Sequence, residues 1–378
     1  MKIAILRERA DGETRVAATP ETVTKLLGLG ATVSIERGAG AAARFPDGDY
    51  EKAGASVGDA ADVVKDADIV LAVRRPSPDV LGGAKSGALV IGTMDPFGSE
   101  GEIDALGRAG YTAVAMEFMP RITRAQVMDI LSSQANLAGY QAVLEAANAF
   151  DRAMPMMMTA AGTVRPAKVF VMGAGVAGLQ AIATAKRLGA VVSATDVRAA
   201  AGEQVESLGA KFIMTDALKD ASGSGGYARE LTADEKAAQA ALTASHIAKQ
   251  DIVITTALIP GRPAPKLVTA DMVASMQPGS VIVDLAAERG GNVEVTKPDE
   301  IVTTANGVQV IGHRNWPARL ATSASSLYAR NLFAFLETMF DKKTKEFAVN
   351  WDDELVKATV LTRGGAIVHP NIKLPGAA

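Results

Sequence analysis

The sequence has 378 residues, a formal net charge of −3 and no cysteine. Its length predicts two domains of ordinary size, and its 48% hydrophobic and 21% charged residues are typical of a soluble globular protein. The lack of cysteine excludes disulfides, thiolate metal sites and a cysteine nucleophile, and three histidines leave little material for a histidine metal site. The near-neutral charge offers no basic face for nucleic acid, and the N-terminus is typical of a strand rather than a signal peptide.

From Met1 to about Pro120, short β-branched runs alternate with helical patterns, such as the helix expected over Glu21–Leu27. The predicted strands are residues 2–6, 32–36, 68–73, 88–92 and 111–116. This alternation predicts βαβ units and a mostly parallel sheet. A long stretch with apolar periodicity, about Arg124–Asn148, then predicts a helix that connects two domains.

A second α/β series follows, with a helix expected near its end over Ser323–Phe340. Its predicted strands are residues 168–173, 191–196, 211–214, 251–257, 280–286 and 308–312. The tail, from about Asp341, is expected to return to the first domain. We therefore predict an α/β fold of two Rossmann-like domains with parallel sheets, joined by long helices with a cleft between them. The first domain is expected to be discontinuous, 1–130 plus 311–378, and the second to span 131–310.

One segment, Lys219–Glu230, interrupts this pattern with glycine and small polar residues. Its composition predicts a mobile surface loop at about 217–231, and such loops often carry function. A disordered insertion without a role is the alternative. Tyr227 favours function, because an aromatic side chain in a glycine-rich loop needs a surface on which to pack.

The most informative local motif begins at Gly173. A predicted buried strand leads directly into Gly173, Gly175 and Gly178, spaced as G-x-G-x-x-G, and a helix is expected to follow. The first glycine permits a tight turn, the second lets the backbone approach a pyrophosphate, and the third lets the helix pack on the strand. The helix N-terminus then favours the anion. In this context the motif predicts a dinucleotide-binding domain.

The strand after this motif ends in Asp196, about 20 residues beyond the glycines, where an acidic residue is expected to bind a ribose hydroxyl. A carboxylate there accepts hydrogen bonds from the ribose and repels a 2′-phosphate, so the sequence favours NAD(H) over NADP(H). Arg198 complicates this interpretation, because an arginine can bind a 2′-phosphate. A solvated surface arginine is the simpler alternative while Asp196 is present.

Catalytic candidates gather in the segment MPRITRAQVMDILSSQANLAGY, residues 119–140. The polar residues are spaced so that several can share one helical face; they are Arg121, Gln126, Asp129 and Ser132. A helix N-terminus with capping residues explains the same pattern without any catalytic role. In a two-domain dehydrogenase, however, the nicotinamide lies where the domains meet. His313, after a predicted strand, is a further candidate for a cofactor contact.

These residues resemble a known family. The segment above, MMMTAAGTV, VMGAGVAGLQAIATAKRLGA, ATDVRAA and TTALIPGRPAP are similar to the NAD(H)-binding component of proton-translocating NAD(P) transhydrogenase, in its form as a separately encoded portion of the alpha subunit. The resemblance covers essentially the whole chain, from RVAATPETV to TRGGAIVHP. The Arg-Gln-Asp-Ser segment is its most specific element.

The resemblance implies a set of nucleotide contacts. Around the nicotinamide and its ribose it places Arg121, Gln126, Asp129, Ile130, Leu131 and Ser132. The residues implied at the pyrophosphate are Gly173, Gly175 and Val176, and those at the adenosine ribose are Asp196, Val197 and Arg198. Gly226 and Tyr227 match a mobile loop that closes over the nucleotide, while Ala257 and Leu258 fall beside the adenosine.

The resemblance also implies partners and a reaction. The family component forms a homodimer and docks on a separate NADP(H)-binding beta subunit, which stands on a membrane-embedded proton channel. Hydride passes directly from NADH to NADP⁺, coupled to proton translocation. The chain is therefore expected in the cytoplasm, attached peripherally to the inner face of the cell membrane through its partner subunits.

Alanine dehydrogenase is the alternative, because it shares the RVA-x-TP opening, in which Arg15 would hold a substrate carboxylate, and the glycine motif. That enzyme needs a lysine in a K-V-K-E-P segment, whereas residues 72–76 read AVRRP here. It also needs a histidine after the following strand, where this chain has GTMD at 92–95. The loss of both proton-handling residues argues against an amino-acid oxidoreductase. Ala72 and Arg74 also depart from the transhydrogenase pattern.

Overall fold

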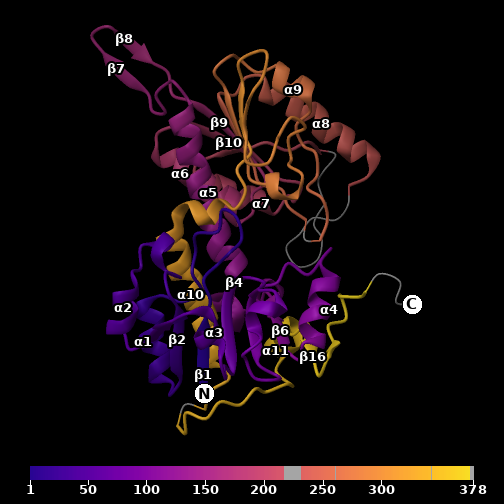
Figure 1. The fold of residues 1–378 in the computed structure, drawn as a ribbon. Coiled ribbons are helices and arrows are strands. Elements are labelled where there is room, and N and C mark those ends of the chain that lie inside the picture. The colour runs from indigo at the N-terminus through magenta and orange to yellow at the C-terminus, as the bar shows by residue number, and fades with distance from the viewer. Residues whose placement is uncertain (217–230, 260, 342, 375–378) are drawn as a thin grey trace. The chain divides into compact units, whose positions relative to one another are not determined.

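The computed structural model describes residues 1–216, 231–259, 261–341 and 343–374 (Figure 1). Their backbone contacts divide the chain into two compact units. The first unit comprises Met1–Gln134 with Ala318–Ala378, and the second comprises Ala135–Pro317. Each unit is built around its own sheet, so the two are described in turn.

The sheet of the first unit has six parallel strands in the order β3-β2-β1-β4-β5-β6. The strands are β1 (Lys2–Ile5), β2 (Thr32–Glu36), β3 (Ser56–Gly58), β4 (Ile69–Arg74), β5 (Leu89–Thr93) and β6 (Thr112–Ala115). Alternate side chains enter two cores, one on each face: Ile3 and Ile5 pack into the first, and Ala4 and Leu6 into the second. Burial on both faces explains why these strands are nearly continuous apolar runs.

The helices of the first unit cover these two faces. They are α1 (Pro20–Gly28), α2 (Asp47–Lys52), α3 (Ala60–Val64), α4 (Glu100–Arg108), α10 (Ala321–Glu337) and α11 (Glu354–Thr359), with 3₁₀ helices η1 (Ala41–Ala43), η2 (Pro78–Leu81), η3 (Met116–Phe118), η4 (Thr123–Met128) and η8 (Trp316–Leu320) at or near the unit. A capping box between Thr19 and Thr22 starts α1. Helix α10 crosses the sheet, and its buried Tyr328 donates to the carbonyl oxygens of Ala72 and Val73 at the end of β4.

The end of the chain packs against the edge of this sheet. After α11, the short strands β16 (Thr362–Arg363) and β17 (Ala366–Ile367) form an antiparallel pair. The Thr362 hydroxyl donates to the carbonyl oxygen of Tyr111 and accepts from the amide of Ala113, which flank the start of the outermost strand, β6. Unpaired edge groups are thereby covered.

The second unit contains a seven-stranded sheet in the order β11-β10-β9-β12-β13-β15-β14. Its strands are β9 (Lys168–Met172), β10 (Val191–Thr195), β11 (Lys211–Phe212), β12 (Ile252–Thr255), β13 (Val281–Asp284), β14 (Ile301–Thr303) and β15 (Gln309–Ile311). All neighbours pair in parallel except β14 with β15. The helices are α5 (Ile130–Ala149), which begins in the first unit, α6 (Val176–Arg187), α7 (Ala201–Ser207), α8 (Ala233–Ile247), α9 (Ala270–Ala274) and the 3₁₀ helix η7 (Ala287–Arg289).

A separate hairpin joins α5 to β9. It consists of β7 (Met157–Thr159) and β8 (Gly162–Val164), paired antiparallel, and every residue of both strands is exposed. In Figure 1 it stands away from the seven-stranded sheet. Because a lone two-stranded hairpin is marginally stable in water, its exposed methionines indicate that another surface covers it.

The predicted α/β class with two parallel sheets is confirmed, but two details of the prediction were wrong. The expected helix over Arg124–Asn148 is broken at Asp129 into η4 and α5, because Asp129 adopts an extended conformation and its carboxylate accepts from the amide of Ser132, as a helix cap does. The edge strand β14 was not expected and is antiparallel. Within the described residues, no helix is both long and apolar enough to cross a membrane.

One buried carboxyl in the first unit has an unsatisfied oxygen. Glu117 Oε1 accepts from the amides of Met94 (2.8 Å) and Asp95 (2.6 Å), whereas its Oε2 is buried without a hydrogen-bond partner in the described portion of the chain. Burial raises the pKa of Glu117 from 4.5 to about 7, although the backbone hydrogen bonds oppose the shift. A carboxyl with a raised pKa favours the folded state at low pH, and this contribution is lost as pH rises from the unfolded pKa through about 7.

We therefore predict that Glu117→Gln reduces the loss of stability between pH 5 and pH 8. Glutamine keeps the Oε1 acceptor and removes the ionisation, so at pH 8 the variant should be more stable than the parent by about 2–3 kcal/mol, with little difference at pH 5. Urea unfolding at both pH values measures this, with Glu346→Gln, an exposed site, as the control. An equal difference at both pH values would contradict the prediction.

Candidate functional site

The sheet of the second unit reverses its direction of winding between β9 and β12. The chain proceeds outward through β9, β10 and β11, then returns to the centre and continues through β12 and β13 on the other side. Ligands of open α/β sheets bind in the crevice at such a switch point, beyond the carboxyl ends of the strands. The residues that follow these strands are Gly173 after β9, Asp196 after β10 and Thr256 after β12.

The three glycines after β9 occupy different environments. Gly173 has φ 106°, a conformation that favours glycine. A Cβ on Gly178 would lie 1.8 Å from the carbonyl oxygen of Gly173, so the first turn of α6 packs directly on the turn before it. A Cβ on Gly175 would meet no atom within 4 Å. The fold therefore requires glycine at 173 and 178, whereas the space at Gly175 is open to a ligand.

This open space lies at the N-terminus of α6. Gly175 precedes the helix and has no side chain with which to cap it, and Val176, the first helical residue, is 41% exposed. The first amides of a helix carry partial positive charge and lack intrahelical partners. A phosphate or other anion fits this place, because it meets backbone donors and no obstructing side chain.

Asp196 is buried beside this turn and is fully engaged. Its Oδ2 accepts from the amide of Ala174 and from Arg198 Nη2, and its Oδ1 accepts from the backbone amide and Nε of Arg198, all at 2.8 Å. Burial alone would raise the pKa of Asp196, but these hydrogen bonds outweigh it and lower the pKa. Val197, between the two, is half-buried. The acid predicted from sequence is thus tied to both the glycine turn and Arg198.

A residue that the sequence analysis missed holds the loop after β12. The Asn292 side chain is fully buried, accepts from the amide of Ala257 (3.0 Å) and donates to the carbonyl oxygen of Ala257 (2.8 Å). This pair of bonds fixes Ala257 at the switch point and leaves the next side chain, Leu258, 46% exposed. No local motif marks Asn292, because its partner lies 35 residues earlier.

The second group of predicted residues belongs to the first unit, on η4 and the start of α5. Asp129 joins these two helices, and its carboxylate accepts from the amide (2.9 Å) and the hydroxyl (2.6 Å) of Ser132. Arg121 and Gln126 are exposed, as is Leu131, while Ile130 is buried. The expected shared helical face is therefore replaced by a helix cap, which brings Asp129 and Ser132 together.

The remaining candidates are placed differently. Gly226 and Tyr227, assigned to the predicted loop at about 217–231, lie outside the described residues. His313 in the second unit packs against the ring of Trp316, with centroids 5.4 Å apart.

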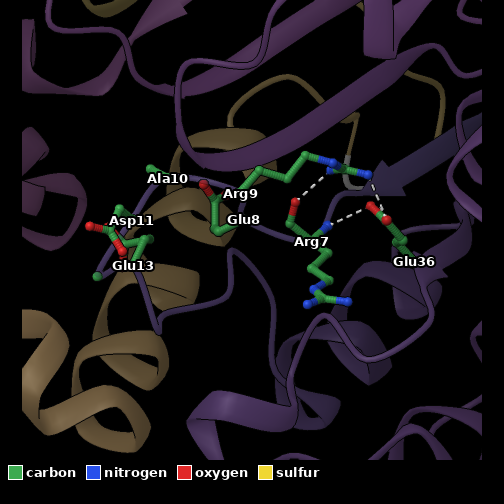
Figure 2. Close-up of a pocket in the computed structure, with 8 residues that line it drawn as sticks. Arg7, Glu8, Arg9, Ala10, Asp11, Glu13 and Glu36 are labelled. Carbon is green, nitrogen blue, oxygen red and sulfur yellow. Dashed lines mark hydrogen bonds and ion pairs between the residues drawn. The ribbon is translucent and has the colours of Figure 1, made fainter.

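The first unit also has a cavity of about 550 Å³ at the carboxyl ends of β1 and β2. Its walls are almost entirely charged, as Figure 2 shows; the lining residues are Arg7, Glu8, Arg9, Ala10, Asp11, Gly12, Glu13 and Glu36. Glu36 accepts from the amide of Arg7 (2.9 Å) and from Arg9 Nη2 (2.7 Å). Burial raises the pKa of Glu8 to about 7, opposed by hydrogen bonds from the amides of Val73 and Arg74.

Arg15, the possible carboxylate clamp, is already paired. It donates to both carboxylate oxygens of Glu13 at 2.7 Å and to Gln134 Oε1 at 2.9 Å, and Arg74 Nε also donates to Glu13 (3.0 Å). Burial would raise the pKa of Glu13, but the hydrogen bond and charge of Arg15, with the charge of Arg74, lower it to about 2. These cations therefore serve an internal carboxylate.

Comparison with known proteins identifies the architecture. Residues 4–138 match the N-terminal domain, and residues 142–370 the C-terminal domain, of the alanine dehydrogenase/PNT family. In Rhodospirillum rubrum, the first of the separately named portions of the NAD(P) transhydrogenase alpha subunit is 53% identical, with 100% of both chains covered. The chain belongs to the NAD(P) transhydrogenase alpha-subunit family. It is therefore a transhydrogenase component of an NAD(H)-binding family, and the naming of its relatives as one portion of a subunit implies partner subunits.

Solved structures agree with this assignment. A transhydrogenase from Sinorhizobium meliloti superposes with a TM-score of 0.88 at 60% identity, covering 97% of this chain and 100% of the other. An L-alanine dehydrogenase superposes with a TM-score of 0.82 at 26% identity, covering 98% of each chain. The fold is thus shared with alanine dehydrogenase, while the sequence is much closer to the transhydrogenases.

The glycine geometry predicts opposite responses to two substitutions. Gly178→Ala forces a Cβ against the Gly173 carbonyl oxygen, so it should destabilise the protein by about 2–3 kcal/mol. Gly175→Ala places its Cβ in open space at an allowed φ of −79° and should cost less than about 1 kcal/mol. Denaturant unfolding of both variants measures the difference, and equal destabilisation would show that the α6 turn is not packed as described.

Proposed function

We propose that this chain is the NAD(H)-binding component of a proton-translocating transhydrogenase, in which hydride passes directly from NADH to NADP⁺ held on a partner subunit. The observation that carries this proposal is the open helix N-terminus at Gly175 beside the buried Asp196, in a chain matched over its full length by transhydrogenase alpha subunits. The bound nicotinamide supplies the hydride chemistry. The task of the chain is to bind and orient the dinucleotide.

In this proposal, the second unit holds the adenosine and pyrophosphate moieties of NAD(H). The proposed pyrophosphate contacts are Gly173, Gly175 and Val176, and the proposed adenosine contacts are Asp196, Val197, Arg198, Ala257 and Leu258. Support comes from their common position at the carboxyl edge of the sheet, with Ala257 fixed by Asn292. Gly226 and Tyr227 are proposed to close over the nucleotide.

The first unit contributes the residues proposed around the nicotinamide and its ribose, namely Arg121, Gln126, Asp129, Ile130, Leu131 and Ser132. Direct transfer between two nicotinamides moves no proton to or from a substrate oxygen or nitrogen. The step therefore requires orientation of the rings at about 3–3.5 Å and exclusion of water, rather than a general acid or base. The Asp129–Ser132 hydrogen bonds supply a fixed polar element suited to that orientation.

The proposed assembly is a homodimer docked on an NADP(H)-binding beta subunit and membrane-embedded proton-channel subunits. The exposed β7–β8 hairpin supports association of two copies, because Met157 and Met158 are 46% and 79% exposed and would be buried by a second subunit. We place the protein in the cytoplasm, on the inner face of the cell membrane, attached through its partner subunits.

A hydride-transfer assay tests this function. Purified chain, NADH and an oxidised NADP analogue are mixed with and without an NADP(H)-binding transhydrogenase subunit, and a parallel reaction contains NADH, pyruvate and ammonium. We expect partner-dependent reduction of the analogue and no pyruvate-dependent oxidation of NADH, because Glu13 already pairs with Arg15 and Arg74. Pyruvate-dependent oxidation would instead establish an alanine-dehydrogenase-like enzyme.

A second prediction concerns the choice of nucleotide. Asp196→Ala removes the acceptor for the ribose and releases Arg198 from its carboxylate, so NADH binding should weaken by about 10–100-fold while NADPH binding improves relative to it. Intrinsic NADH fluorescence titrations measure both affinities. The double variant Asp196→Ala/Arg198→Ala is the control and should lose the NADPH gain. Unchanged selectivity in the single variant would remove Asp196 from the ribose site.

A further inference from the structure

The Asp129 segment is formed from two short pieces of helix that meet at an angle. The 3₁₀ helix η4 ends at Met128, Asp129 is extended with φ −75° and ψ 94°, and α5 begins at Ile130. Asp129 and Ser132 bond to each other, but those bonds lie within α5's first turn and do not set the direction of η4. Something else must hold the two pieces in register.

Asn331 of helix α10 contacts both sides of this junction. Its side chain is 7% exposed. Its Nδ2 donates to the carbonyl oxygen of Val127 in η4 at 2.7 Å, and its Oδ1 accepts from the hydroxyl of Ser133 in α5 at 2.7 Å. One carboxamide thus spans Asp129, with one bond on the residue two positions before it and one on the residue four positions after it.

A carboxamide suits this place because it donates and accepts at the same time. Aspartate could accept from Ser133 but, when ionised, could not donate to Val127, and leucine of similar size could do neither. Because Asn331 is buried, loss of either bond also leaves a polar group without its partner. The geometry at Asp129 therefore depends on the chemistry of residue 331 as well as on its volume.

The contact continues into the buried charge cluster of the first unit. Gln134 Nε2 lies 3.3 Å from the Ser133 hydroxyl and donates to the carbonyl oxygen of Ala324, while Gln134 Oε1 accepts from Arg15. Arg15 is in turn held by Glu13. The start of α5 is therefore fixed from two sides, by Asn331 and by the Arg15–Gln134 pair, which gives Arg15 a structural role.

We propose that Asn331 is a positioning residue for hydride transfer: by joining Val127 to Ser133 it sets the orientation of Asp129 and Ser132 without touching the nucleotide. This inference rests on the proposed function, which places those two residues at the nicotinamide. Misplacement of a reacting ring by about 1 Å costs about 100-fold in rate even when binding is kept. Loss of Asn331 should therefore lower the transfer rate far more than the affinity for NADH.

The test uses Asn331→Leu, Asn331→Asp and, as the control, Arg330→Gln, which alters an exposed neighbour on the same helix. The first measurement is amide hydrogen exchange of residues 127–133 in the full chain without nucleotide. We expect faster exchange there in Asn331→Leu, a smaller change in Asn331→Asp, which keeps the Ser133 bond, and none in Arg330→Gln.

The second measurement separates binding from transfer. With the NADP(H)-binding subunit, single-turnover hydride transfer should fall by about 10–100-fold in Asn331→Leu, while the Kd for NADH changes by less than about threefold. Unchanged transfer, or a Kd that rises as much as the rate falls, would overturn the positioning role. If the parent chain itself transfers no hydride, the proposed function fails, whereas the exchange data still show separately whether Asn331 holds the junction.

Discussion

The second unit depends on a contact between two stretches of backbone, in which the first turn of α6 lies against the end of β9 with no side chain between them. The position of Gly178 against the carbonyl oxygen of Gly173 makes this contact possible. It also places the free amides of α6 beside Asp196, whose carboxylate accepts from Ala174 in the same turn. The glycines that allow the sheet and helix to pack are thus the ones that leave an anion site open.

Much of the fold was predictable because its signals are local. Buried parallel strands read as apolar runs, and the helices between them as periodic segments, so both sheets could be foreseen. The helix break at Asp129 could not, because apolar spacing continues through it and only a hydrogen bond to Ser132 reveals the cap. Strand β14 was also missed, since its residues are only partly buried at a sheet edge and show no apolar run.

The candidate site divides in the same way. Gly173, Gly175 and Asp196 could be proposed from spacing, because a strand, a turn and the following strand determine their positions together. Asn292 and Asn331 could not, since each acts on a loop far away in the sequence, 35 residues for Asn292 and 198 for the bond from Ser133 to Asn331. An asparagine within a helix or loop has no pattern that announces such a contact.

The two sheets share a strand order about their centres, yet their switch points differ in chemistry. After β9 the chain offers glycines and free amides, whereas after β1 it offers charged side chains that pair with one another. Glu13 takes up both Arg15 and Arg74, so neither guanidinium retains the separate charge that a substrate carboxylate would need. The same pairing fixes Gln134 and the start of α5. A position that could bind a small acid thus serves to hold a backbone in place, as expected of a protein whose reaction requires orientation and no proton transfer.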